Sequence, residues 1–280
     1  MVQEYKININ EFEPKHVFEC GQCFRWEKQG NSYIGVFGNN VMSVEKNGDT
    51  VLFKGVCARD IKEICEEYFL LNIDYSEIKK RLIKMDPNIK PAILYGKGIR
   101  ILKQDLWEMI ISFIISANNN IPRIQKTIKQ LCKNYGEKIE YNGKVYYTFP
   151  TPQQLFKASV EDLRKIGLGY RDRYVYETTR ALLKKEIDIE KLCYMDTDTA
   201  RKSLLSLTGV GRKVADCILL FGLNRYEVFP TDVWVKRAII DDYFNREDIA
   251  LNKIQEFANA TYGELAGYAQ QYLFYYKRGK

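Results

Sequence analysis

Residues 207–217 read LTGVGRKVADC and place a tight turn between two predicted helices. Gly209 and Gly211 allow the chain to turn sharply and leave the outer surface of the turn free of side chains. Val210 lies between them and is the apolar residue that can pack between the two helices. The backbone N–H groups exposed at the start of the second helix can then bind a phosphate group.

The turn can be interpreted as purely structural or as functional. Glycine pairs are common at plain corners between packed helices, and a bare G-x-G favours that interpretation. The longer string closely matches the helix-hairpin-helix element, which binds DNA backbone phosphates without sequence preference. The spacing predicts the first helix over 199–207, capped by Asp198.

Lys213 lies in the first turn of the second helix. The ordinary interpretation of a single lysine is a solvated surface charge. Here the helix dipole and the neighbouring Arg212 disfavour an ammonium, and packing against residues 214–220 would desolvate it. These effects favour the neutral amine, which is a nucleophile, although the nearby Asp216 would oppose them.

A second stretch, residues 227–237, reads EVFPTDVWVKR. Thr231 or Asp232 is the expected N-cap of the helix that follows. A capping carboxylate is fixed in place and kept ionised, so a structural cap does not exclude a role in catalysis. Asp232 would then be held across one loop from Lys213.

Composition restricts the chemistry. The 280 residues include 43 Lys and Arg against 36 Asp and Glu, a net charge of +7 that suits a phosphate-containing partner. The single histidine, His16, excludes metal sites with several histidines and lacks the context of a Ser-His-Asp triad. Acid–base or covalent chemistry must therefore come from Asp, Glu, Lys, Tyr or Cys.

The seven cysteines are odd in number and scattered, and no secretory signal precedes them, which predicts free thiols in a reducing compartment. Only Cys20 and Cys23 form a C-x-x-C pair, too little for a zinc ribbon or an iron–sulfur loop. No apolar run approaches the ~18 residues of a membrane span. We therefore expect no metal site and no membrane partner.

The pattern along the chain predicts an α+β fold. Short alternating runs from 24 to 55, separated by turns at 38–40 and 47–49, predict a small antiparallel sheet. From about residue 58 the apolar spacing becomes helical. We expect an N-terminal sheet domain with flanking helices over 1–95, then a two-lobed, mostly helical core over 96–280. The predicted helix starts in this core are Asp105 with a capping box to Glu108, Asn120 with Pro122 at the first helical position, Thr151 and Ser159.

The two stretches and four further motifs resemble the helix-hairpin-helix DNA glycosylase superfamily. The match is to its 8-oxoguanine DNA glycosylase branch, of the eukaryotic type that some bacteria also carry. The further motifs are CGQCFRW (20–26), SANNNIPRI (116–124), GLGYRDRY (167–174) and GYAQQYLF (267–274). They occur in order over nearly the whole chain. The resemblance places the helix-hairpin-helix at about 198–222 and a catalytic loop at about 225–233.

The resemblance implies a bifunctional glycosylase and AP lyase. The lysine matched by Lys213 attacks C1′ of the damaged nucleoside, forms a Schiff base, and cuts the strand by β-elimination. Asp232 matches the aspartate that stabilises the cationic sugar. The damaged base must leave the duplex to be reached.

The base pocket follows from the same resemblance. Gly21 matches the glycine whose carbonyl accepts a hydrogen bond from N7–H of 8-oxoguanine, which undamaged guanine lacks. Gln270 matches the residue that reads the Watson–Crick edge. Phe274 and Cys217 match the pair that sandwiches the flipped ring. Without the resemblance, Phe274 and Cys217 would be interpreted as core residues.

Further matched residues grip the DNA. Asn118 and Tyr170 match residues inserted into the duplex, and Arg123 and Arg171 match arginines that hold the orphaned cytosine. We therefore expect a preference for cytosine opposite the lesion. The remaining DNA-binding candidates are Gly209, Val210, Gly211 and Trp234. Trp234 and Cys23 depart from the family pattern, which commonly has histidine and serine there.

The resemblance implies double-stranded DNA containing oxidised guanine as partner, a monomer, and no cofactor. It leaves open a monovalent or calcium ion at the hairpin. The absence of an extended basic tail or targeting peptide predicts a bacterial cytoplasmic enzyme acting at the nucleoid. The alternatives are another base-excision glycosylase of the superfamily and a non-catalytic DNA-binding module, which would need neither Lys213 nor Asp232. A redox protein built on Cys20 and Cys23 is the weakest alternative.

Overall fold

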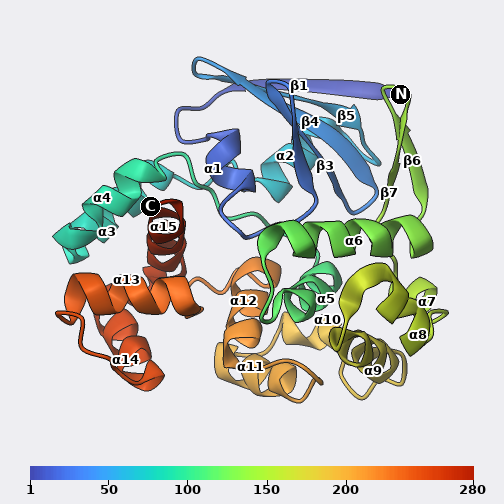
Figure 1. The fold of residues 1–280 in the computed structure, drawn as a ribbon. Coiled ribbons are helices and arrows are strands. Elements are labelled where there is room, and N and C mark those ends of the chain that lie inside the picture. Colours follow the sequence, from blue (N-terminus) through green and yellow to red (C-terminus); the bar gives the residue numbers. More distant parts are fainter.

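A computed structural model describes residues 1–280. Its N-terminal part is a five-stranded antiparallel sheet in the order β1-β5-β4-β3-β2, which lies above α6 in Figure 1. The strands are β1 Val2–Asn8, β2 Trp26–Gln29, β3 Ser32–Phe37, β4 Asn40–Asn47 and β5 Thr50–Val56. The predicted meander over 24–55 is confirmed, with its first strand beginning at Trp26. The added edge strand β1 was not predicted.

The rest of the chain is mostly helical, so the α+β fold class is confirmed. A small hairpin of β6 Lys138–Tyr141 and β7 Lys144–Tyr147, which was not predicted, interrupts the helices. The helices are α1 Pro14–Phe18, α2 Ile61–Tyr68, α3 Tyr75–Met85, α4 Lys90–Tyr95, α5 Leu106–Ser116, α6 Ile121–Tyr135, α7 Pro152–Leu155, α8 Val160–Leu163, α9 Arg171–Leu183, α10 Ile189–Leu192, α11 Thr197–Leu205, α12 Arg212–Gly222, α13 Val233–Tyr243, α14 Leu251–Tyr262 and α15 Ala266–Gly279.

The helix starts follow the predicted caps, with three corrections. Asp105, Asn120, Thr151 and Ser159 each accept a hydrogen bond from the third residue of their helix. Glu108 does not complete a capping box: its carboxylate is buried and pairs with Arg25 at 3.1 Å. Pro122 occupies the second helical position, because α6 begins at Ile121.

The third correction concerns the first helix of the hairpin. α11 begins at Thr197, and its cap is Asp196, whose Oδ1 accepts from the Asp198 and Thr199 amides at 3.1 and 3.0 Å. Asp198 lies in the first turn and pairs with Arg201. Asp196, two residues earlier, satisfies the free helix amides, so the charge of Asp198 is available to bind an arginine instead.

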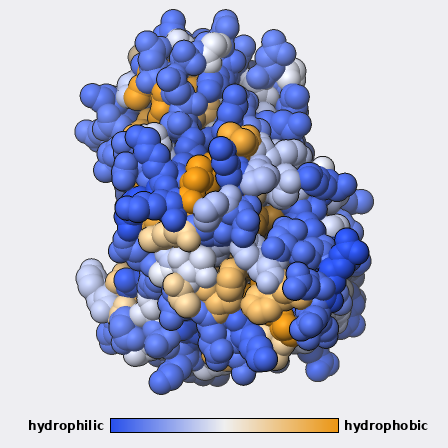
Figure 2. All heavy atoms as spheres, turned by 90° about the vertical axis from the view of Figure 1, so that its left-hand side faces the viewer, coloured by the Kyte–Doolittle hydropathy of each residue, from blue (hydrophilic) through white to orange (hydrophobic).

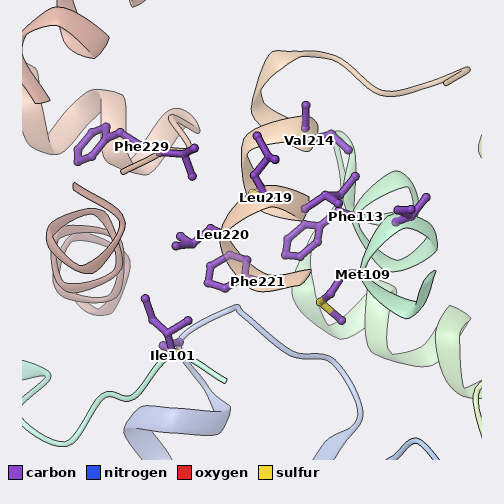
Figure 3. Close-up of a cluster of buried hydrophobic side chains, with 14 of the residues drawn as sticks. Ile101, Met109, Phe113, Val214, Leu219, Leu220, Phe221 and Phe229 are labelled. Atoms are coloured by element: carbon purple, nitrogen blue, oxygen red, sulfur yellow. The ribbon is translucent and has the colours of Figure 1, made fainter. Parts of the chain in front are cut away.

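The large hydrophobic core is built around the contact of α5 with α12. The rings of Phe113 and Phe221 stack with centroids 5.5 Å apart, and Leu220 points from the opposite side of α12 toward Gly267 of α15 (Figure 3). Full burial of each such side chain contributes about 1.5–3 kcal/mol. This packing fixes α12, and with it the position of Lys213.

A second hydrophobic cluster lies beneath the sheet, around Trp26, Phe53 and Phe69. Buried residues of α3 and α4 belong to the larger cluster instead. The division into domains 1–95 and 96–280 stays a prediction. No helix is both long and apolar enough to cross a membrane. The face in Figure 2 is largely hydrophilic, with hydrophobic residues in scattered spots.

Candidate active site

Lys213 occupies the second position of α12, and its side chain is half-buried. Gly211 is the N-cap of this helix and provides no side-chain hydrogen bond to the first turn. The Lys213 Nζ lies 5.5 Å from the centroid of the Phe113 ring, which comes from the core face of α5. The amine is thus held between a positive helix end and an apolar wall, as predicted from its position.

Asp232 is the N-cap of α13, so of the two caps that the sequence offered, Thr231 and Asp232, the structure has the second. Its Oδ1 accepts hydrogen bonds from the amides of Trp234 at 3.0 Å and Val235 at 2.9 Å. No protein group donates to Oδ2. The cap therefore fixes the carboxylate in orientation and leaves one oxygen free to stabilise positive charge.

Lys213 and Asp232 both line one cavity of about 740 Å³. The wall comes from the loop that precedes β2, the junction of α5 and α6, and the starts of α12 and α13. Phe274, near the end of α15, completes the wall of the cavity. Gly21, Phe274 and Trp234 line the same cavity, so the structure brings together five of the predicted site residues.

Gly21 lies directly against Phe274 and has a left-handed backbone conformation, with φ of +79°. A Cβ atom at this position would lie 2.8 Å from Cε1 of Phe274, closer than real Cβ contacts. Both the conformation and the contact require glycine. The backbone of residue 21 thereby forms a wall of the cavity.

Two buried glutamines hold the loop that carries Gly21. The Gln22 Nε2 donates to the Arg100 carbonyl at 2.7 Å, and its Oε1 accepts from the Leu102 amide at 2.9 Å. The Gln271 Nε2 donates to the Cys20 carbonyl at 2.5 Å. These contacts fix the backbone on both sides of Gly21.

Gln270 and Cys217 are buried and do not contribute to the lining of this cavity. Gln270 precedes Phe274 by one turn of α15, and its Oε1 has no hydrogen-bond partner in the protein. Burial raises the pKa of the Cys217 thiol to about 11, although the charge of Lys213 one turn earlier opposes the shift. Cys217 is therefore a neutral thiol, as an aromatic contact requires.

The two predicted DNA-inserting residues, Asn118 and Tyr170, are exposed, and the predicted cytosine-binding Arg171 lies buried beside them. Asn118 is exposed with φ of +50°, and Tyr170 is 52% exposed. Arg171 is buried, with Nε 2.8 Å from the Ala117 carbonyl and Nη2 2.8 Å from the Asn118 carbonyl. Its guanidinium also lies 4.4 Å from the centroid of the Tyr170 ring.

Arg123 differs from Arg171. It lies in the first turn of α6, is exposed, and makes no ion pair or side-chain hydrogen bond within the protein. The structure thus leaves one of the two predicted cytosine-binding arginines free and engages the other with backbone carbonyls.

The hairpin has the predicted geometry. Gly209 has φ of +82°, and a Cβ there would lie 2.4 Å from Cδ2 of Tyr174. Val210 is buried between the helices. The amides of Gly209 and Gly211 donate to no group of the protein, so they are free to bind a phosphate.

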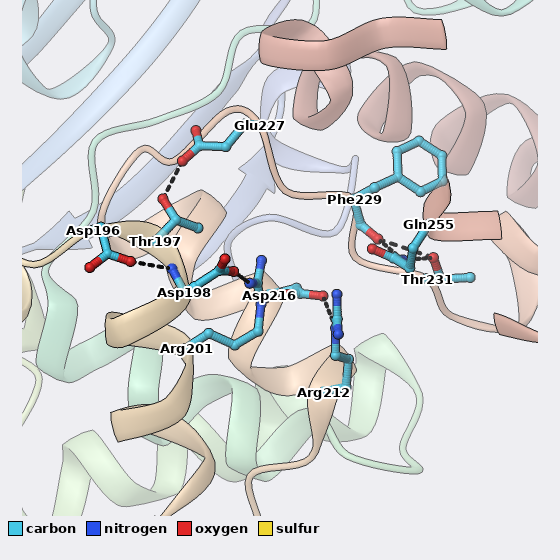
Figure 4. Close-up of polar contacts among 10 residues, drawn as sticks. All are labelled: Asp196, Thr197, Asp198, Arg201, Arg212, Asp216, Glu227, Phe229, Thr231 and Gln255. Carbon is cyan, nitrogen blue, oxygen red and sulfur yellow. Dashed lines mark hydrogen bonds and ion pairs between the residues drawn. The ribbon is translucent and has the colours of Figure 1, made fainter. Parts of the chain in front are cut away.

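Asp216 pairs with two arginines and makes no ion pair with Lys213. Its buried carboxylate accepts from the Nε of Arg201 at 2.7 Å and from the Nε of Arg212 at 3.4 Å (Figure 4). These bonds tie α12 to α11 within the hairpin. Two arginines therefore neutralise the carboxylate that the sequence suggested would oppose a neutral Lys213.

No three His, Cys, Asp or Glu residues are grouped so that they could hold a metal ion. His16 lies outside the cavity lining and accepts a hydrogen bond from the Gly98 amide through Nδ1 at 3.2 Å. The cavity therefore offers an amine and a carboxylate as its reactive pair.

Comparison with known proteins identifies the family. Residues 4–110 match the 8-oxoguanine DNA glycosylase N-terminal domain, and residues 111–268 match the HhH-GPD superfamily of base excision DNA repair proteins. The chain belongs to the 8-oxoguanine DNA glycosylase/lyase family. It is accordingly a bifunctional DNA repair enzyme of the helix-hairpin-helix type.

Individual relatives support this assignment. The N-glycosylase/DNA lyase of Saccharomyces cerevisiae is 33% identical over 264 residues, which cover 85% of this chain and 70% of the relative. The N-glycosylase/DNA lyase OGG1 of Arabidopsis thaliana is 32% identical over 287 residues, 96% of this chain and 78% of the relative. The Clostridium acetobutylicum 8-oxoguanine glycosylase/lyase, solved with double-stranded DNA containing cytosine opposite 8-oxoG, is 41% identical. Its TM-score is 0.94, with 100% of this chain and 98% of that chain covered.

Sequence reasoning did not identify every residue that shapes the site of this glycosylase/lyase. Phe113 was not identified as a site residue, because its place beside Lys213 depends on the packing of α5 against α12. Gln22 and Gln271 lie within two of the matched motifs, but their supporting role could not be predicted, because their partners are distant in sequence. Only the three-dimensional structure reveals these supporting contacts.

Proposed function

We propose that the protein excises 8-oxoguanine from duplex DNA through a Schiff base on Lys213 and then cleaves the strand by β-elimination. The observation that carries this proposal is the convergence of Lys213 and Asp232 on one cavity, with Gly21 and Phe274 in its wall. A non-catalytic DNA-binding module would need no such pair.

The chemistry follows from the two groups. The neutral Nζ of Lys213 attacks C1′, and the bond from C1′ to the base breaks, with its electron pair leaving on the base. The free Oδ2 of Asp232 stabilises the positive charge that develops on the sugar. Loss of a proton from the attached nitrogen and opening of the sugar ring give the imine. Removal of a proton from C2′ then expels the 3′ phosphate.

Base recognition uses groups that the structure leaves unpaired. The Gly21 carbonyl accepts from N7–H, which is present in 8-oxoguanine and absent from guanine. The unpartnered Oε1 of Gln270 provides an acceptor for the Watson–Crick edge. Phe274 and the neutral Cys217 thiol stack on the two faces of the ring.

The direct test compares two duplexes that differ only in one atom of one base. We expect single-turnover excision from a duplex with 8-oxoguanine opposite cytosine and none from the same duplex with guanine. Cleavage of the strand 3′ to the lesion should accompany excision. Tight binding without excision of 8-oxoguanine would contradict the proposal and favour another lesion or a binding module.

Replacing Asp232 with asparagine should slow base excision about 10²–10³-fold, because the charge is lost at the sugar. Asparagine is also a good N-cap, so the thermal midpoint should change little. Single-turnover excision and thermal unfolding of both proteins measure the two effects. A variant that excises within threefold of the wild type would show that the carboxylate charge is not used.

Replacing Arg123 with alanine should abolish most of the preference for cytosine opposite the lesion. Arg123 is the exposed, unengaged arginine of the predicted pair, and each such base contact contributes about 1–3 kcal/mol. Excision rates opposite C, A, G and T measure the preference. Lys126→Ala, an exposed position one turn later in α6, should lower all four rates equally. An unchanged preference in Arg123→Ala would contradict this role.

The remaining expectations also form part of the proposal. An amine and a carboxylate supply both reactive groups, so the reaction needs no cofactor, and a monovalent or calcium ion at the hairpin would have a structural role. The protein acts as a monomer on double-stranded DNA at the bacterial nucleoid in the cytoplasm. The free amides of Gly209 and Gly211, together with Val210 and Trp234, belong to the surface that binds this DNA.

A further inference from the structure

The loop that joins α12 to α13 carries Asp232 at its end and is held at its start by several contacts. Arg225 donates through Nη2 to the Met195 carbonyl at 2.8 Å. The Gly267 amide at the start of α15 donates to the Tyr226 carbonyl at 2.6 Å. The first half of the loop is thus fixed from two directions.

The second half of the loop packs through the buried Val228 and Phe229, and one side chain makes the hydrogen bonds that reach it from outside. Gln255 of α14 donates through Nε2 to the Phe229 carbonyl at 2.8 Å and to the Thr231 hydroxyl at 2.9 Å (Figure 4). The Thr231 hydroxyl in turn donates to the Phe229 carbonyl at 3.0 Å. No other hydrogen bond from outside the loop reaches residues 228–231.

Gln255 contacts the loop that carries Asp232 from outside the catalytic cavity. It does not line the cavity that holds Asp232 and Phe274. It lines a separate cavity of about 420 Å³ together with Lys213, Asp216 and Thr231. The hydrogen bonds of the Gln255 side chain go to the loop and not to Lys213, so the loop is the route by which we expect Gln255 to act on the reaction.

We propose that Gln255 is a positioning residue that holds residues 229–231 and thereby sets the Asp232 carboxylate relative to Lys213. This inference rests on the proposed function of Asp232. The cap bonds of Asp232 fix the carboxylate within α13, whereas Gln255 fixes where the chain enters α13. A displacement of about 1 Å at a reacting centre can cost a factor of ~10² in rate.

The first test uses Gln255→Leu, which keeps the size of the side chain and removes both hydrogen bonds. Single-turnover excision of 8-oxoguanine opposite cytosine should fall about tenfold, with duplex affinity within twofold of the wild type. Gln255→Glu, whose carboxylate cannot donate to the Phe229 carbonyl at neutral pH, should lose at least as much. Asn259→Ala, an exposed position one turn later in α14, should excise at the wild-type rate.

The second test separates positioning from general destabilisation. In an Asp232→Asn background, Gln255→Leu should cause no further loss, because the group that it positions is already gone. Rates are normalised to the active fraction measured by trapping on a preformed abasic site. A Gln255→Leu rate within twofold of the wild type, or an equal loss in both backgrounds, overturns the inference. An inactive wild type would instead contradict the proposed function.

Discussion

Replacing Lys213 with glutamine should abolish both base excision and strand cleavage while leaving duplex binding within about threefold. Glutamine keeps a polar side chain beside Phe113 but provides no nucleophile. Loss of a nucleophile commonly costs factors of 10³ or more in rate. A gel assay under single-turnover conditions measures the chemistry, and a mobility shift measures the binding.

The matched control is Lys202→Gln. Lys202 is an exposed lysine of α11 that makes no ion pair, so it carries the same charge without facing the cavity. This variant should excise at the wild-type rate. Excision by Lys213→Gln at more than a tenth of the wild-type rate would show that water or another amine attacks the sugar.

Replacing Gly21 with alanine should reduce excision of 8-oxoguanine about 10²-fold. The new Cβ would meet Phe274 at 2.8 Å, so either the ring or the loop must move in the wall of the base pocket. The left-handed backbone adds a strain of about 1–2 kcal/mol, which should lower the stability as well. Single-turnover excision and thermal unfolding measure the two effects.

The variant Gly30→Ala separates the two effects of Gly21→Ala, the clash in the base pocket and the backbone strain. Gly30 has φ of +59° in the turn between β2 and β3, and a Cβ there would meet no atom within 4 Å. This variant should lose comparable stability and keep the excision rate. If Gly21→Ala and Gly30→Ala excise equally well, the contact of residue 21 with Phe274 has no part in recognition.

Much of the fold could be predicted because its signals are local. Turn residues and alternation defined β2 to β5, and capping residues defined the starts of α5, α6, α7 and α8. β1 was missed because its place depends on pairing with β5, in which Tyr5 lies opposite Phe53. The alternation within an exposed edge strand is weak evidence on its own.

In the candidate site, too, features set by nearby residues could be predicted and contacts between distant residues could not. The positions of Lys213 and Asp232 at helix starts followed from nearby residues, and the structure places both at one cavity. Contacts between distant residues could not be predicted: Gly21 against Phe274, or Gln255 beneath the Asp232 loop. Arg171 was expected to hold the orphaned cytosine, and in the structure the carbonyls of Ala117 and Asn118 accept hydrogen bonds from it. Its role stays a prediction.

The most direct test of the central claim is borohydride trapping on a duplex with one 8-oxoguanine opposite cytosine. Borohydride reduces the imine between enzyme and sugar to a stable amine, and peptide mass spectrometry locates the attached residue. The account predicts that one DNA strand becomes attached to one enzyme molecule through Lys213, and that Lys213→Gln forms no adduct. Excision without any adduct, or an adduct on another residue in the wild type, would contradict it.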